Sequence, residues 1–185
     1  MTPRLFLVAP ETIAEALLLD CAKAACAAAD CATILVAPGI SQEAVEGLQA
    51  LDLAVILNDA EVRQVHYLKA DGLLMTNIED VDDARKNLKT EVLGFLAGAS
   101  RHMAMEAAEA GADFVAFIPS KQVAGIPIVG WWQEVTDVPG VVLDPVVDAQ
   151  LRPQNPDFIR PSDDMWADAA AAARVVKGLM EQWTA

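Results

Sequence analysis

The sequence predicts an α/β fold, a single compact (β/α)8 TIM barrel domain over residues 1–185, and three observations favour it. Short apolar runs recur along the chain, and each is followed by a segment with helical periodicity. The runs are continuously apolar, as in strands buried on both faces of a parallel sheet. Eight such units suit a closed barrel, whereas a flavodoxin-like open sheet has about five or six strands and leaves two units unexplained.

The expected strands are short runs rich in Val, Leu, Ile and Phe. We place them at residues 5–8, 33–37, 53–57, 72–75, 92–97, 114–117, 140–143 and 158–159. The chain has 185 residues, and a barrel of this kind typically has about 250. The loops between the elements must therefore be short.

The expected helices follow these strands. We place them at residues 11–29, 43–51, 80–88, 102–110, 130–135 and 163–183, with a further helix around His66. Ser41 and Ser162 stand where an N-cap residue is favoured, at the start of the second and the last of these ranges. Gly111 suits the position after a helix end, where a left-handed conformation is common.

Composition excludes several classes of partner. The net charge of −14 argues against a nucleic-acid groove, which needs clustered Lys and Arg, and against anionic membranes. No apolar stretch reaches the ~20 residues of a membrane span, and the N-terminus lacks the pattern of a secretory signal. Cys21, Cys26 and Cys31 follow neither a zinc nor a disulfide pattern, and we interpret them as small apolar residues in a reducing compartment. We expect a cytoplasmic protein.

In a (β/α)8 barrel, function resides in the loops at the C-terminal ends of the strands. Asp59 and Glu79 follow neighbouring strands, and their carboxylates are the oxygen ligands that Mg²⁺ prefers. The alternative is that both acids only start helices, where the dipole favours them. Lys121 and the segment from Ser100 to His102 suit an anion, although Ser100 serves equally as a helix cap.

Several motifs together resemble a known family. They are Leu5-Phe6-Leu7-Val8, Asn58-Asp59, Ala70-Asp71-Gly72, Ser100-Arg101-His102 and the stretch from Glu106 to Phe117. In this order and at similar spacing they resemble thiamine phosphate synthases, and the related thiazole tautomerases share the same barrel. The resemblance covers most of residues 4–121, and the stretch from Ser100 to Phe117 is its specific part.

The resemblance implies an activity and a set of site residues. Thiamine phosphate synthases join hydroxymethylpyrimidine diphosphate to thiazole phosphate and release pyrophosphate, using Mg²⁺, so the expected partners are small phosphorylated molecules. Together with the positions at the strand ends, the resemblance gives an expected site. Its metal ligands are Asp59 and Glu79, and its catalytic residues are Ser100, His102 and Lys121. Its substrate-binding residues are Asn58, Asn77, Arg160 and Ser162. A homodimer is compatible with the prediction.

The sequence also departs from the family pattern. The family has Gln-Leu-Arg-Glu-Lys after its second strand, where residues 35–39 carry no cation. Leu74 replaces a His. Asp144 and Pro145 replace the glycines of a phosphate cradle; Asp144 repels phosphate, and Pro145 has no N–H to donate. Each lost interaction with a leaving diphosphate typically costs ~3 kcal/mol.

The departures leave three functional hypotheses. The first is a thiamine-phosphate-synthase-like enzyme with impaired or lost activity. The second is a non-catalytic relative that binds a phosphate ligand. The third is a tautomerase-like enzyme, for which His102 is the histidine placed at a strand end. Near the last helix, Asp163 and Asp164 occupy the first turn, so we expect that end to be self-capped and phosphate to bind weakly there.

Overall fold

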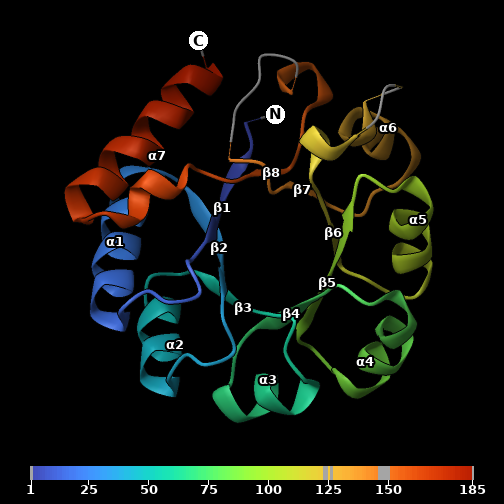
Figure 1. Ribbon diagram of the computed structural model, residues 1–185, viewed down its shortest axis with the longest axis horizontal. Helices are drawn as coiled ribbons and strands as arrows, with labels where there is room; N and C mark the ends of the chain where they lie inside the picture. Colours follow the sequence, from blue (N-terminus) through green and yellow to red (C-terminus); the bar gives the residue numbers. More distant parts are fainter. Residues whose placement is uncertain (1, 123–124, 126, 146–150, 185) are drawn as a thin grey trace.

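The computed structural model describes residues 2–122, 125, 127–145 and 151–184, and its strands close into the barrel that the sequence predicts (Figure 1). Each strand pairs in parallel with the next along the chain, and the last pairs with the first. The strands are β1 Arg4–Val8, β2 Cys31–Val36, β3 Ala54–Asn58, β4 Gly72–Met75, β5 Val92–Gly98, β6 Phe114–Phe117, β7 Gly140–Val142 and β8 Phe158–Ile159.

Helices form the outer layer of the barrel, as Figure 1 shows. The α-helices are α1 Glu15–Ala28, α2 Gln42–Gln49, α3 Val62–Leu68, α4 Val81–Asn87, α5 Arg101–Glu109, α6 Ile128–Val135 and α7 Ala169–Thr184. Four 3-10 helices lie in loops, namely η1 Ile78–Asp80, η2 Pro119–Lys121, η3 Arg152–Gln154 and η4 Asp163–Trp166. Within the described residues, no helix is long and apolar enough to cross a membrane.

The last helix differs from the expectation of one helix over 163–183. It is divided into η4 and α7, and Ser162 caps the short η4 through the N–H of Asp164 at 3.3 Å. The buried Trp166 donates its indole N–H to the carbonyl of Val8 at 2.9 Å, at the end of β1. Asp168 then accepts the N–H of Ala171 at 2.7 Å, in the first turn of α7. A tertiary contact at Trp166 accompanies the interruption.

The first helix also begins later than expected, at Glu15 instead of residue 11. Residues 11 and 12 form a turn after Pro10, and Ala14 at the N-cap makes no side-chain capping bond. The extra loop residues extend the connection between β1 and α1 at the C-terminal end of the barrel.

The interior of the barrel is filled by inward-facing side chains, chiefly Phe6, Leu35, Ile56, Leu74, Phe114, Ala116, Val141 and Leu143. Phe114 occupies the space beside Gly94, where an added Cβ would lie 2.0 Å from its ring. Its ring also packs against Phe6 at a centroid distance of 5.7 Å. The interior is thus a packed core, and functional groups are confined to its ends.

A carboxylate precedes each even-numbered strand, at Asp30, Asp71, Asp113 and Asp157. Three of these carboxylates accept a backbone N–H of the preceding strand, from Val55 (2.8 Å), Leu93 (2.8 Å) and Gly140 (2.7 Å) respectively. Each of the three also accepts a side-chain N–H from the helix before that strand, namely from Gln49, Arg85 and Gln133.

Asp30 differs from the other three because it binds the guanidinium of Arg4 in β1, with both N···O distances at 2.9 Å. This contact holds the pKa of Asp30 below its ordinary range. We call the four residues the aspartate clips. They join the strands in pairs at the N-terminal end of the barrel, which is the end associated with stability.

The clips give a stability prediction. Asp71→Ala removes the acceptor of the Val55 N–H, and an unsatisfied, part-buried donor costs about 1–3 kcal/mol. We expect Tm to fall by about 2–4 °C for each kcal/mol lost in a chain of this size. Asp82→Ala is the control, because the ion pair of Asp82 with Lys86 is exposed and such pairs contribute about 0–1 kcal/mol. Equal losses of Tm in the two variants would contradict the role of the clips.

Candidate functional site

The mouth of the barrel at its C-terminal end collects polar residues from several strands. Side chains alternate along a strand, so Asn58 and Arg160, two residues beyond the interior side chains of Ile56 and Phe158, share their inward orientation. The interior core ends below them. Asn58 and Arg160, both predicted substrate-binding residues, therefore lie on the inward side of the strand ends.

The carboxylate of Asp59 is held at the boundary between β3 and β4. It accepts the hydroxyl of Thr76 at 2.9 Å, and the N–H of Asp59 donates to the carbonyl of Leu74 at 2.8 Å. The backbone of Asp59 is left-handed, with φ of 48°. Asp adopts this region more readily than most residues, and such conformations cluster at functional sites.

The second predicted metal ligand, Glu79, lies in η1 after β4 and is exposed. The side chain of Asn77 accepts the N–H of Glu79 at 3.3 Å and donates to Asp80 at 2.7 Å. Asn77, predicted to bind substrate, therefore has a local capping role in the structure. Thr76 therefore holds Asp59 after β3, and Asn77 orders the loop after β4 that carries Glu79.

Asp59 and Glu79 offer carboxylate oxygens, the type of ligand that Mg²⁺ prefers. No group of three or more His, Cys, Asp and Glu side chains suited to a metal is found in the described part of the chain. Mg²⁺ is often held by one or two carboxylates, with water and substrate phosphates at its other positions. Asp59 and Glu79 are oxygen donors of that type, so the residues fit an ion that binds together with a phosphorylated ligand.

The loop after β5 carries Ser100, and its hydroxyl accepts the N–H of Met103 at 3.2 Å. Ser100 is therefore the N-cap of α5, one of the two roles that the sequence left open. Arg101 places its guanidinium 4.9 Å from the ring centroid of Trp131 on α6, a cation–π contact between neighbouring helices.

His102 and Lys121 are both exposed. The side chain of His102 on α5 is 86% exposed, and its Nε2 atom lies 3.5 Å from Glu106, one turn further along the same helix. Lys121 ends η2, the short helix after β6. The structure thus places these two predicted catalytic residues on separate segments, with His102 directed along the surface of its own helix.

Sequence reasoning missed a contact that joins the loops after β6 and β7. Ser120 donates both its N–H and its hydroxyl to the carboxylate of Asp144, each at 2.7 Å. The sequence placed both residues at strand ends, but it carried no signal that they are partners. Hydrogen bonds to an ionised acceptor are among the stronger ones, so this pair fixes the two loops together and uses donors that a bound anion would need.

At the end of β8, the side chains that could bind an anion are likewise paired with carboxylates of the chain itself. One terminal nitrogen of Arg160 donates to the carbonyl of Leu143 at 3.2 Å, and the other pairs with Asp163. The Nε atom of Arg160 is buried and makes no hydrogen bond. The hydroxyl of Ser162 is engaged by Asp164. The cation and the hydroxyl predicted to bind phosphate thus already have carboxylate partners.

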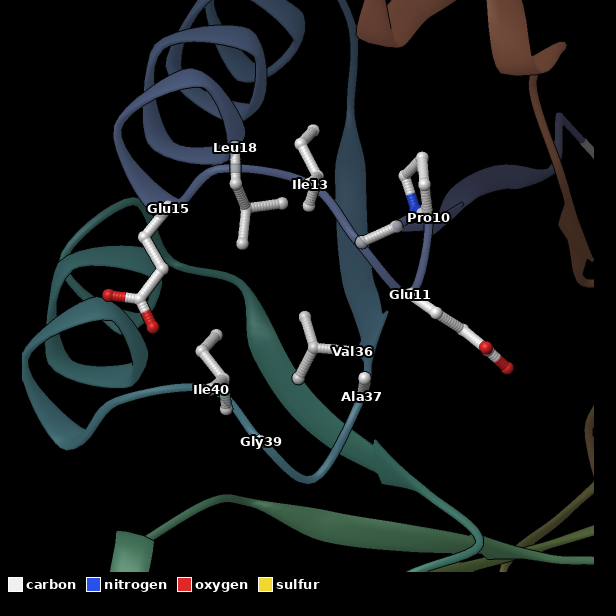
Figure 2. Close-up of a pocket in the computed structure, with 10 residues that line it drawn as sticks. Pro10, Glu11, Ile13, Glu15, Leu18, Val36, Ala37, Gly39 and Ile40 are labelled. Atoms are coloured by element: carbon white, nitrogen blue, oxygen red, sulfur yellow. The ribbon is translucent and has the colours of Figure 1, made fainter.

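The loops after β1 and β2 enclose a pocket of about 140 Å³ (Figure 2). Its lining contains two carboxylate residues, Glu11 and Glu15, and no Lys or Arg. Glu15 accepts the hydroxyl of Ser41 at 2.7 Å and its N–H at 2.6 Å. These bonds, from the hydroxyl first and the N–H second, lower the pKa of Glu15 below its ordinary 4.5. The loop after β2 therefore lies beside two carboxylates, Glu11 and Glu15, and no cation lines the pocket next to it.

Comparisons with known proteins agree with this architecture. No protein-family model matches the chain. The chain is 33% identical to the thiamine-phosphate synthase of Erythrobacter litoralis (strain HTCC2594) over an alignment of 156 residues, and the match covers 74% of the chain and 72% of that protein. It is 34% identical to the thiamine-phosphate synthase of Rhodospirillum centenum (strain ATCC 51521 / SW) over an alignment of 143 residues, and this match covers 70% of the chain and 68% of that protein.

Solved structures show the same fold. The chain superposes on thiamine phosphate pyrophosphorylase from Pyrococcus furiosus with a TM-score of 0.73 and 17% identity, covering 100% of the chain and 98% of that structure. It superposes on tryptophan synthase from M. tuberculosis with a TM-score of 0.71 and 16% identity, covering 97% and 92%. At such identities these similarities establish the barrel fold alone.

The contact between Glu15 and Ser41 gives a pH-dependent prediction. Because the pKa of Glu15 is lowered in the folded state, its stabilisation is present above pH 4.5 and is lost as the pH falls through the folded value. We expect Glu15→Gln to lower stability at pH 7, with the difference from wild type narrowing as the pH falls through the lowered pKa of Glu15. Denaturant unfolding at a series of pH values from 7 downward measures this, with exposed Glu43→Gln as control. A difference that stays constant with pH would contradict it.

The contacts at β7 and β8 give a ligand prediction. We expect phosphate and pyrophosphate without Mg²⁺ to produce no saturable thermal shift at micromolar concentrations and fixed ionic strength. A site at a hundredfold excess over Kd would add ~2.7 kcal/mol, or roughly 5–10 °C in a chain of this size. Such a shift, abolished by Arg160→Ala or Ser162→Ala, would show that Asp163 and Asp164 do not close this end to phosphate.

Proposed function

The chain belongs to the thiamine-phosphate synthase family, and from this premise we propose that it performs the reaction of that family slowly. In this reaction hydroxymethylpyrimidine diphosphate is joined to thiazole phosphate and pyrophosphate is released. The observation that carries the proposal is the placement of Asp59, whose carboxylate is fixed by Thr76 beside the inward-facing Asn58. We assign this activity to the cytoplasm.

The site must above all stabilise the negative charge of the leaving pyrophosphate. In this proposal Asp59 and Glu79 would hold Mg²⁺ together with the diphosphate, and the ion would supply positive charge for the leaving pyrophosphate. Thr76 keeps the carboxylate of Asp59 in one orientation through its 2.9 Å hydrogen bond. In the proposal Asn58 would donate its amide N–H groups to an oxygen of the diphosphate.

The slow rate follows from the contacts around the rest of the mouth. The pocket beside the loop after β2 is lined by no cation, and Asp163 already pairs with Arg160. Asp144 likewise takes both donors of Ser120. Loss of a single stabilising donor typically costs ~3 kcal/mol, about a hundredfold or more in rate.

A second candidate is a relative that binds phosphorylated ligands without turnover. The same neutralised donors favour it, because Asp144 and Asp163 raise the barrier to pyrophosphate departure and leave Asp59 and Glu79 free to hold a metal–phosphate ligand. The tautomerase-like alternative has less support, since the ring of His102 is 86% exposed and faces Glu106 on its own helix.

Pyrophosphate release with both substrates and Mg²⁺ tests the proposal. We expect turnover well below the ~1–10³ per second of ordinary enzymes, and we expect Asp59→Asn to abolish what remains. Asp82→Asn, an exposed acid on α4, is the control and should leave the rate unchanged. Turnover at ordinary rates, or residual activity unaffected by Asp59→Asn, would contradict the proposal. No turnover with Mg²⁺-dependent calorimetric binding of either substrate would select the second candidate.

A further inference from the structure

Two of the three cysteines lie together at the N-terminal end of the barrel, away from its mouth. Cys26 is in the last turn of α1, and Cys31 is the first residue of β2, with two residues between the helix and the strand. Cys31 belongs to the core between strands and helices, and Cys26 packs against that core. A hydrogen bond joins the two thiols. The folded chain therefore holds Cys26 and Cys31 as a thiol pair.

The three cysteines differ in their access to solvent. Cys21 is 0% exposed on α1 and Cys31 is 7% exposed, whereas Cys26 is half-buried beside the exposed Ala27. A small reagent in solution therefore meets the sulfur of Cys26 before that of either of the other cysteines.

The hydrogen bond also divides the acidity of the thiol pair unequally. The thiol of Cys31 donates to the sulfur of Cys26, and this bond lowers the pKa of Cys26 against the opposing effects of burial and of the Asp52 carboxylate. The same bond and burial raise the pKa of Cys31, followed by the charges of ionised Cys26 and of Asp30, and Arg4 opposes them. Because the thiolate is the reactive form of cysteine, Cys26 is the nucleophile of the pair.

We propose that Cys26 is a site of oxidation by hydroperoxides and that Cys31 resolves the product to a disulfide between α1 and β2. In the first step the thiolate of Cys26 attacks the O–O bond, and one oxygen is transferred to the sulfur as a sulfenic acid. The other oxygen leaves with a proton as water or an alcohol. In the second step the sulfur of Cys31 displaces the hydroxyl of the sulfenic acid, which leaves with the proton of Cys31 as water. Two thiols are oxidised to one disulfide, and one hydroperoxide is reduced.

The contact between the two thiols in the reduced protein favours the second step. The sulfur atoms are already hydrogen-bonded, and a shift along this contact brings them to the ~2.05 Å of a disulfide. Oxidation of Cys26 to a neutral sulfenic acid also removes one of the charges that oppose ionisation of Cys31. Neither cysteine belongs to the candidate site at the mouth, so the proposal stands independently of the proposed function.

Tryptic peptide mapping tests the proposal because the cleavage sites separate the cysteines. Trypsin cleaves after Lys23, so Cys21 lies on the peptide that ends there. The next cleavage site is Arg63, so Cys26 and Cys31 share the following peptide. Folded, reduced protein is treated with a stoichiometric amount of hydrogen peroxide, alkylated in denaturant and digested.

We expect the shared peptide to lose two hydrogen atoms and both of its alkylation sites, whereas Cys21 stays fully alkylated. Dithiothreitol should restore both sites. The proposal is overturned if Cys26 and Cys31 both remain alkylated after peroxide treatment, or if the disulfide links the shared peptide to the peptide of Cys21.

Two variants separate the attacking thiol from the resolving one. In Cys31→Ala the sulfenic acid at Cys26 has no partner thiol, so we expect dimedone to trap it there. Cys26→Ala should leave Cys31 fully alkylated after the same peroxide treatment. Cys21→Ala is the matched control, and it should form the disulfide as wild type does. Oxidation of Cys31 in a folded Cys26→Ala would contradict the assigned order of the two steps.

The pH dependence of alkylation gives a readout that does not require oxidation. We expect iodoacetamide to modify Cys26 several-fold more slowly at pH 7 in Cys31→Ala than in wild type, with the midpoint of the rate shifted to higher pH. The reason is that the variant lacks the S–H donor that stabilises the thiolate. The Cys21→Ala control should keep the wild-type midpoint. Identical midpoints in wild type and Cys31→Ala would show that the two thiols do not act as a pair.

Discussion

The hydrogen bonds of the aspartate clips are the constraint on which the rest of the barrel depends. Each clip joins an even-numbered strand to the strand before it at the N-terminal end, and three of them also fasten the preceding helix. A carboxylate that accepts a backbone N–H and a side-chain N–H leaves little freedom in strand register. With register fixed at that end, the loops at the opposite end can vary without loss of the fold.

At the mouth of the barrel, hydrogen bonds between side chains compete with the binding of an anionic ligand. Its potential anion donors are largely occupied by the chain's own carboxylates, as in the pairs of Ser120 with Asp144 and of Arg160 with Asp163. These contacts stabilise the loops, but they also reduce the positive potential that a diphosphate requires. The exposed Asp59 and Glu79 remain as oxygen donors. The proposed reaction therefore depends on a metal ion more than on protein cations.

The loops after β1 and β2 border a pocket at the C-terminal end of the barrel. The cation-free segment after β2 gives a wall of small residues, and the delayed start of α1 at Glu15 lengthens the opposite wall. The bonds between Glu15 and Ser41 then hold the two helix starts together.

Local patterns in the sequence were sufficient for the barrel, the approximate strand positions and the helix cap at Ser41, because each depends on residues that are neighbours along the chain. For Ser100 the sequence left a helix cap and an anion contact open, and the structure shows the cap. The interruption of the last helix is accompanied by a hydrogen bond from Trp166 to Val8, near the other end of the sequence. The partners of Asp144 and of the aspartate clips are likewise set by folding, although the regular placement of Asp before even-numbered strands is visible afterwards. The sequence alone does not reveal which hydrogen-bond donor a given carboxylate will bind. Only the closed barrel, which brings distant loops within hydrogen-bonding distance, decides that.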